Sequence, residues 1–296
     1  MKFIRKIFSS IPFSKNLLSF ILKLFPEFIL VTHSKIKLYV SSKDIKNLID
    51  AVIPTKNNNR IHEVFSVLLK EDDIVIDVGG NIGLFSVIAS KKCKSVHVFE
   101  PDPDCFKNIE KNLRYHRLDN LILNQLALSN KNEEKIFFKD SFYSTLGSFA
   151  LENIKHKESV IKIRAIKLDD YVENKINEPV NFIKLNIQGA EGHAIEGAKN
   201  LISRDLPIVL TEFWPYGLKN SGYEPELLIN FFQELKYEFV QVNQHNLDLE
   251  KKNYDDLIKV CKNLDEELVL YFLLQNSNSK DYYEDLDSLI DKNLSE

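Results

Sequence analysis

Two carboxylates and a glycine-rich turn are the residues of this chain whose types and spacing are best suited to chemistry. Asp77 lies in the apolar segment 74–78, and Glu100 directly follows a second apolar segment, 95–99. The turn after Asp77 comprises Gly79, Gly80, Asn81 and Gly83. Glycines let a ligand approach the backbone, the helix after such a turn offers free N–H groups, and a carboxylate can accept hydrogen bonds from a ribose diol. The pattern predicts a nucleoside-binding crevice.

The spacing of the turn distinguishes two classes of nucleoside cofactor. A dinucleotide site typically has the pattern G-x-G-x-x-G, whereas here the glycines are Gly79, Gly80 and Gly83, with Asp77 two residues before the first. An acid at that position would repel a pyrophosphate and attract the cationic methionine part of S-adenosylmethionine. The spacing therefore favours S-adenosylmethionine, and an NAD-dependent oxidoreductase is the alternative enzyme.

Composition limits the class of protein and its partners. The 296 residues, 44% hydrophobic and 28% charged, are ordinary for a globular protein with a sizeable core. The three cysteines form no C-x-x-C pair, so we expect a reducing compartment and a cytoplasmic protein. The seven histidines show no metal-ligand spacing, so no catalytic metal is predicted. Basic residues near the N-terminus are interleaved with apolar ones, which argues against nucleic acid as a partner.

The N-terminal segment has two interpretations. Residues 1–59 are predicted to form a helical, amphipathic extension, because apolar residues recur at helical spacing up to Phe28 and no acid precedes Glu27. The helices would either pack on the rest of the protein or place residues 1–28 on the inner face of a membrane as a peripheral contact. No apolar run is long enough to span a bilayer. The oligomeric state is not set by the sequence.

Helix and strand patterns alternate through the rest of the chain. The predicted strands are near 74–78, 95–99, 121–127, 135–139, 160–166, 181–187, 208–211, 237–243 and 267–274. The predicted helices are near 60–70, 82–91, 102–115, 190–202 and 225–235. This order is typical of a doubly wound α/β fold, in which ligands bind at the carboxyl ends of the strands. The segments 135–139 and 160–166 are expected to pair around a polar loop.

Five segments, in order, resemble the FkbM family of S-adenosylmethionine-dependent methyltransferases. They are residues 77–83, 99–103, 167–170, 182–191 and 207–212. The resemblance covers about residues 60–275, which would form the methyltransferase domain, followed by an acidic tail at 276–296. It implies a class I methyltransferase (Rossmann-like) fold with a doubly wound, mostly parallel seven-stranded sheet, an antiparallel edge strand and the N-terminal extension.

The resemblance also implies an activity and a set of cofactor contacts. The activity would be transfer of a methyl group to a hydroxyl of a saccharide, glycolipid or secondary metabolite, so the partner would be a small-molecule or glycan acceptor. Asp77 and Gly79 would contact the methionine part of S-adenosylmethionine, and Glu100 the ribose. The segment from Gln125 to Ala127 would lie beside the adenine.

One segment departs from the family pattern, which has two acids where this chain has Asn186 and Gln188. Amides keep the shape and a hydrogen-bonding oxygen but lose the charge. Hard cations prefer carboxylates, so we expect no Mg²⁺ or Ca²⁺ here, while positioning of the cofactor by hydrogen bonds could survive. The change leaves open a homologue that binds S-adenosylmethionine without catalysis.

Removal of a proton from an alcohol acceptor usually needs a base within hydrogen-bond reach. The candidates are Glu212, Asp169, His193 and Lys184. Glu212 is favoured, because an acid at the end of a buried apolar strand requires a partner. The alternatives are structural roles: an acid that opens a helix for Asp169, a solvent-facing position on its helix for His193, and an ion pair with an acid for Lys184.

Overall fold

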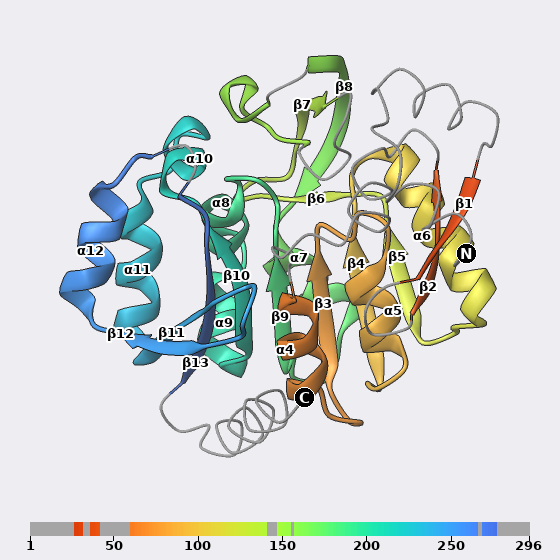
Figure 1. Cartoon of the computed structure of the whole chain (residues 1–296), viewed down its shortest axis with the longest axis horizontal. Coiled ribbons are helices and arrows are strands. Elements are labelled where there is room, and N and C mark those ends of the chain that lie inside the picture. Colours follow the sequence, from red (N-terminus) through yellow and green to blue (C-terminus); the bar gives the residue numbers. More distant parts are fainter. Residues whose placement is uncertain are drawn as a thin grey trace, which may run out of the picture.

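An eight-stranded sheet lies at the centre of the protein (Figure 1). The computed structural model describes residues 27–31, 36–41, 60–140, 147–154, 157–265 and 268–276. In sheet order the strands are β12 (Leu249–Lys252), β11 (Tyr237–Val242), β13 (Leu270–Asn276), β10 (Ile208–Phe213), β9 (Phe182–Leu185), β3 (Ile74–Val78), β4 (Ser95–Phe99) and β5 (Leu121–Asn124). Strands β10, β9, β3, β4 and β5 are parallel, because helical crossovers connect them.

The doubly wound, mostly parallel sheet is therefore confirmed, with two differences at one side. The antiparallel strand β13 lies between β10 and β11 rather than at the edge. The edge is formed by an eighth strand, β12, antiparallel to β11. Strand β12 was not predicted because its four residues contain a single apolar side chain, Leu249, and so carry no alternating pattern.

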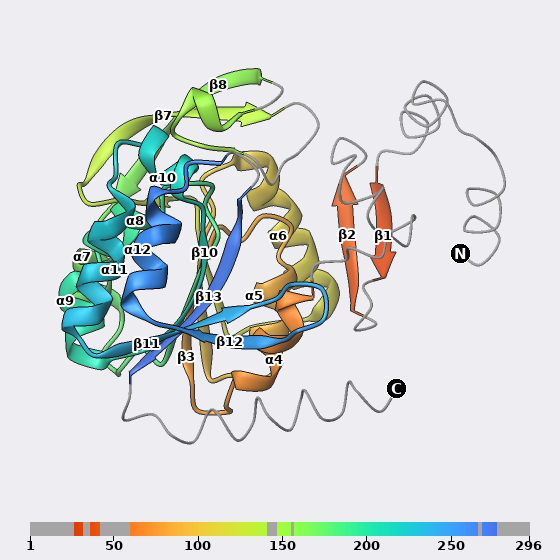
Figure 2. The same ribbon diagram turned by 60° about the vertical axis from the view of Figure 1, so that its left-hand side comes forward.

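Helices cover both faces of the sheet (Figure 2). One face is covered by α7 (Leu168–Lys175), α8 (Glu191–Glu196), α9 (Lys199–Asp205), α11 (Pro225–Glu234) and α12 (Tyr254–Lys262). The other is covered by α4 (Ile61–Leu68), α5 (Leu84–Ser90) and α6 (Pro103–His116). Ile76 and Val78 of β3 belong to the core under the first layer, and Val75 to the core under the second. Asp77 therefore points toward the second layer, because successive strand side chains alternate between faces.

A three-stranded sheet lies beyond one end of the central sheet, at the top of Figure 1. Its strands are β6 (Ala127–Leu128), β8 (Lys157–Ile166) and β7 (Glu133–Asp140). The predicted pairing of two strands around a loop is confirmed, since β7 and β8 are antiparallel. The short helix η2 (Leu151–Asn153) lies between β7 and β8 in the chain. It contacts the short helix α10 (Pro215–Asn220).

Two strands, β1 (Glu27–Val31) and β2 (Lys37–Ser41), form an antiparallel pair within the range 1–59, for which helices were predicted. The helical prediction is wrong at these residues, because the segment 36–40 alternates between apolar and polar side chains and is rich in β-branched and aromatic residues. Residues 1–26, with most of the proposed membrane segment, and the tail 277–296 lie outside the described residues.

Strand β2 contacts α6, and Asn112 of α6 bonds to the backbone of Tyr39 in β2. Figure 2 shows the two elements on the same side of the protein. The buried Asn112 side chain accepts a hydrogen bond from Tyr39 N at 2.6 Å and donates to Tyr39 O at 3.0 Å. The same amide nitrogen donates to Ile82 O at 2.8 Å. Leu38 and Val40 pack beside Ile82 in a small apolar cluster. The β2 segment thus supports the turn between β3 and α5.

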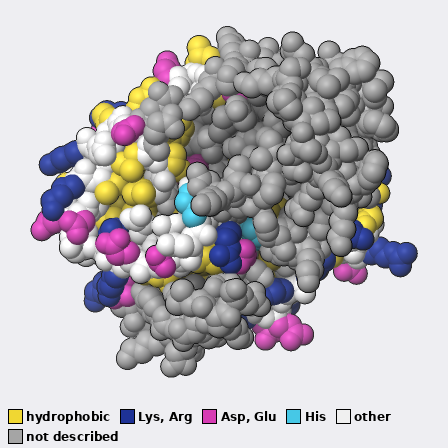
Figure 3. All heavy atoms as spheres, viewed as in Figure 1, with side chains coloured by type: hydrophobic (Ala, Val, Ile, Leu, Met, Phe, Trp, Pro, Cys, Tyr) yellow, Lys and Arg dark blue, Asp and Glu magenta, His cyan; other side chains and the backbone are white. Residues whose placement is uncertain are grey.

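The described surface carries both signs of charge. On the face shown in Figure 3, Lys and Arg side chains are interspersed with Asp and Glu rather than gathered in one stripe. Among the described helices, none is both long and apolar enough to cross a bilayer.

Candidate active site

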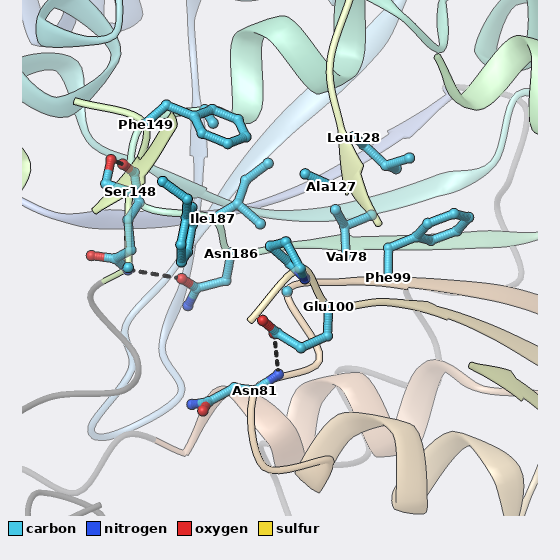
Figure 4. A pocket seen from close by; sticks show the side chains of 16 residues that line it. Val78, Asn81, Phe99, Glu100, Ala127, Leu128, Ser148, Phe149, Asn186 and Ile187 are labelled. Atoms are coloured by element: carbon cyan, nitrogen blue, oxygen red, sulfur yellow. Dashed lines mark hydrogen bonds between the residues drawn. The ribbon is translucent and has the colours of Figure 1, made fainter. Parts of the chain in front are cut away.

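A cleft opens at the carboxyl ends of β3, β4 and β9, beneath the three-stranded sheet (Figure 4). It contains about 560 Å³ of space, counted out to the solvent at its mouth. Its walls are formed by Val78, Gly79, Asn81, Phe99, Glu100, Pro101, Ala127, Leu128, Phe137, Gly147, Ser148, Phe149, Asn186, Ile187, Gln188 and Ala190. The position is the one that the doubly wound fold predicts for a ligand.

Among the described residues that line the cleft, Glu100 is the one with a carboxylate. Two backbone N–H groups donate hydrogen bonds to it. Its Oε2 accepts from Asn81 N at 2.8 Å, and its Oε1 accepts from Asp102 N at 2.9 Å. Burial raises the pKa of Glu100 to about 7, although these two backbone hydrogen bonds act in the opposite direction. Each oxygen keeps a lone pair, so the side chain can still accept hydrogen bonds from a diol in the cleft.

The glycines of the turn are required by neighbouring protein atoms. A Cβ at Gly79, where φ is +80°, would lie 2.3 Å from Asn186 O, and a Cβ at Gly80 would lie 2.6 Å from a methyl of Val98. Gly83, with φ +88°, begins α5. The N–H groups of the turn itself are occupied: Gly79 N and Gly80 N donate to Phe99 O, and Asn81 N donates to Glu100. The turn is thus fixed by the protein itself, and Gly79 and Asn81 line the cleft.

Asp77 and Lys184 form a buried ion pair behind the cleft. Lys184 Nζ lies 3.0 Å from Asp77 Oδ1, and the two side chains are 5% and 0% exposed. Lys184 Nζ also donates to Gly79 O at 2.8 Å and Val78 O at 3.2 Å. Ser86 Oγ of α5 donates to Asp77 Oδ2 at 2.6 Å. Neither charged side chain is among the residues that line the cleft, because β3 directs Asp77 toward α5. The contact of Asp77 with the cofactor stays a prediction.

Asn186, Gln188 and Glu212 form a chain of hydrogen bonds at the end of the cleft next to β9. Gln188 Nε2 donates to Asn186 Oδ1 and to Glu212 Oε2, each at 3.0 Å. Glu212 lies near the end of β10, and its side chain is buried, with 5% of the residue exposed. It also accepts a hydrogen bond from the hydroxyl of Tyr271 at 3.3 Å. Asn186 and Gln188 line the cleft, whereas Glu212 reaches it only through Gln188.

The loop between β9 and α8 is stabilised by a buried acid. Glu191 Oε1 accepts from Ile187 N at 2.7 Å, and Oε2 accepts from Gly189 N at 2.9 Å. Burial raises the pKa of Glu191. Gln188 adopts φ +55° and Gly189 φ +91°, so the loop turns sharply between them. These contacts hold the Gln188 side chain in the cleft wall.

The other two predicted bases lie away from the cleft. Asp169 accepts hydrogen bonds from Asn200 N and Leu201 N at 3.2 and 2.8 Å, so it caps the first turn of α9. His193 Nε2 lies 2.8 Å from Ser221 O, where it donates a hydrogen bond. Among the predicted cofactor contacts, Ala127 lines the cleft, whereas Gln125 is exposed and does not.

Sequence reasoning missed the wall formed by the three-stranded sheet. Phe137 of β7 lines the cleft, and Ser148 and Phe149 lie across it from Glu100 (Figure 4). Phe137 packs so closely on Gly147 that a Cβ there would lie 2.4 Å from its ring. The alternation of β7 predicted a strand, but no pattern in the sequence indicated that this strand would cover the cleft.

The described residues contain no group of three or more His, Cys, Asp or Glu side chains that could hold a metal ion. The absence of a catalytic metal stays a prediction.

Comparison with known proteins identifies the same family that the sequence resembles, over a range that includes most of the parallel strands. The model of the methyltransferase FkbM domain matches residues 77–239. Hexuronic acid methyltransferase AglP of Haloferax volcanii is 27% identical over 177 residues, which are 59% of this chain and 68% of that protein. The 2-O-methyltransferase NoeI of Sinorhizobium fredii is 23% identical over 206 residues, which are 64% of this chain and 82% of NoeI.

A solved structure, that of methyltransferase FkbM from Methylobacillus flagellatus KT, is similar at a TM-score of 0.44 and 14% identity. The match covers 71% of this chain and 47% of the solved one.

Proposed function

The chain belongs to the FkbM methyltransferase family, and from this premise we propose that it is an S-adenosylmethionine-dependent O-methyltransferase. Its acceptor would be a hydroxyl of a saccharide, glycolipid or secondary metabolite. The observation that carries the proposal is Glu100, a buried carboxylate that lines the cleft at the end of β4. A carboxylate at this position of a doubly wound sheet is suited to the ribose of a nucleoside.

The described cleft residues fit such a cofactor. Glu100 would hold the ribose diol, and the apolar side chains of Phe99, Ala127 and Leu128 would flank the adenine. Gly79 and Asn186 lie toward β9, where the methionine part would bind. When bound, the cofactor supplies a methyl group on a positively charged sulfur, which an oxygen nucleophile can displace.

Positioning carries the catalysis in this proposal. A displacement on carbon needs the acceptor oxygen held in line with the methyl group, and well-oriented reactants account for a large share of such rate enhancements. None of the four predicted bases, Glu212, Asp169, His193 and Lys184, lines the cleft. Glu212 is connected to it through Gln188, so we assign Glu212 the role of orienting Gln188 rather than accepting the proton.

The names of the two relatives support a saccharide acceptor, since one is a hexuronic acid methyltransferase and the other a 2-O-methyltransferase. The test is transfer of labelled methyl from S-adenosylmethionine to a panel of saccharides, with NMR analysis of the product. We expect a methyl ether on one saccharide hydroxyl. A product methylated on nitrogen or carbon, or oxidation of a substrate with NAD, would contradict the proposal, and cofactor binding without turnover would indicate a non-catalytic homologue.

A further inference from the structure

The end of the cleft next to β9 is built from two amides that follow that strand. Asn186 and Gln188 both line the cleft, and Gln188 is 9% exposed. Figure 4 shows Asn186 in the cleft wall. Glu100 and Ala127, by contrast, follow β4 and β5, which lie on the other side of β3 in the sheet. If the nucleoside occupies the side of β4 and β5, the amides lie at the end left for the methyl group and its acceptor.

Glu212 determines which way round both amides lie. A carboxylate offers only acceptor oxygens, and one oxygen of Glu212 is 3.0 Å from Gln188 Nε2. Rotation of the Gln188 amide by half a turn would place its oxygen against that carboxylate, which is unfavourable. The second N–H of Gln188 Nε2 donates to Asn186 Oδ1, also at 3.0 Å. The orientation therefore passes from Glu212 through Gln188 to Asn186.

This arrangement leaves one donor and one acceptor for a ligand. Gln188 Oε1 and Asn186 Nδ2 have no hydrogen bond to any of the described residues. Neither is among the buried side-chain atoms of the described residues that lack a hydrogen bond, which are Asp77 Oδ1 and His193 Nδ1. Asp77 Oδ1 is instead held by its ion pair with Lys184. Both atoms thus remain accessible from the cleft, because their residues form its wall.

We propose that Asn186 and Gln188, oriented by Glu212, bind two neighbouring hydroxyls of an uncharged saccharide acceptor. One hydroxyl would donate to Gln188 Oε1 and the next would accept from Asn186 Nδ2, a pairing that a vicinal diol can satisfy. A uronate whose carboxylate took the place of the donating hydroxyl would set one acceptor against another at Gln188 Oε1, because a carboxylate has no proton to donate. The inference rests on the proposed function and narrows its acceptor to neutral sugars with adjacent hydroxyls.

The test uses variants that preserve shape. Asn186→Asp replaces the free donor by an acceptor, and Gln188→Glu places a carboxylate 3.0 Å from Glu212. The full-length protein would be assayed for methyl transfer to methyl glycosides of neutral hexoses, each paired with its uronate and its monodeoxy analogues. We expect neutral glycosides to be preferred, and loss of either hydroxyl or either amide to raise the acceptor KM about tenfold or more.

A further variant, Glu212→Gln, and the pH dependence of Gln188→Glu distinguish a loss of amide orientation from a loss of folding. Glu212→Gln removes the acceptor-only partner of Gln188, so the preference for neutral glycosides over uronates should fall. Gln188→Glu should lose acceptor affinity as the pH rises, because two adjacent carboxylates cannot both ionise without repulsion. The control is Asn263→Asp, an exposed amide after α12 that changes the charge equally and lies outside the cleft wall. It should leave the acceptor KM unchanged.

Binding of S-adenosylhomocysteine, measured by calorimetry on each variant, distinguishes failure of the proposed function from failure of the inference about the acceptor. If the parent protein does not bind it, the proposed function fails. If the parent binds it but prefers a uronate, only the present inference is overturned. If the parent binds it but methylates no saccharide, both the O-methyltransferase proposal and the present inference are overturned. An unchanged acceptor KM in Asn186→Asp overturns it as well.

Discussion

At the scale of single residues, the ion pair between Asp77 and Lys184 shows how the cleft is built from behind. Its cation holds the carbonyls of Val78 and Gly79, so one buried charge fixes the turn between β3 and α5. The sequence predicted that Asp77 would lie at the end of a strand, and it offered pairing with an acid as one role for Lys184. It did not predict that both side chains would lie outside the cleft lining, because that depends on which strand face α5 covers.

Removal of one partner of this pair should destabilise the protein strongly. Lys184→Met would leave the Asp77 carboxylate buried without its cation, so we expect the free energy of unfolding to fall by about 3–5 kcal/mol. Urea unfolding measures the loss. The double variant Asp77→Asn, Lys184→Met should recover much of it, since no buried charge is then left alone.

The matched control is Lys94→Met, which breaks the exposed pair of Lys94 and Glu178, whose side chains are 49% and 55% exposed. That variant should lose less than about 1 kcal/mol. Equal losses in the two single variants would refute the importance of the buried pair.

The raised pKa of Glu100 leads us to expect that both the stability of the fold and the affinity for the ligand depend on pH. Burial raises its pKa to about 7 in the folded protein, whereas an unfolded glutamate titrates near about 4.3. The folded state therefore holds the proton over the window between these values, and Glu100 contributes stability at low pH that is lost as the pH rises through about 7. A ribose diol donates to the ionised form, so ligand binding should behave in the opposite way.

We expect the affinity for S-adenosylhomocysteine to increase as the pH rises through about 7, the pKa of Glu100. In Glu100→Gln this component should disappear, because an amide does not titrate. Calorimetry at a series of pH values gives the comparison. An identical pH dependence in the parent and the variant would exclude Glu100 as its source.

At the scale of elements, the apolar segments predicted the central strands well. Segments 74–78 and 95–99 match β3 and β4, because a run of apolar residues bounded by turn residues has few other solutions. Helix α12 was missed, since only two of its side chains, Leu257 and Cys261, are buried in an otherwise polar segment. The β1–β2 pair was missed because the helical spacing seen up to Phe28 was extended over segment 36–40, whose own alternation is that of a strand.

The contact between β2 and α6 gives a prediction for Asn112. Asn112→Ala would remove its bonds to Tyr39 and to Ile82 O, leaving buried backbone groups unpaired, at a cost of about 1–3 kcal/mol. Hydrogen exchange should show faster exchange at residues 36–41, and because Ile82 follows the glycine turn, ligand affinity should fall too. The control Lys107→Ala, at an exposed position of α6, should change neither. Retained protection of residues 36–41 in Asn112→Ala would show that β2 is held by other contacts.

At the scale of the whole molecule, a parallel sheet brings residues that are distant in the sequence to one edge. Glu100, Asn186 and Gln188 meet there as the strand order requires, and this part of the site could be predicted from the sequence. The wall of Phe137, Ser148 and Phe149 could not, because it depends on how the second sheet packs across the first. For the same reason the acceptor was harder to infer than the cofactor.

The central claim is that this cleft binds S-adenosylmethionine through Glu100. Its most direct test is calorimetric titration of the full-length protein with S-adenosylhomocysteine, beside Glu100→Ala and the control Glu178→Ala, which removes an exposed acid. The account predicts binding by the parent and the control, and a loss of about tenfold or more in Glu100→Ala. No binding by the folded parent, or preferential binding of NAD, would contradict it.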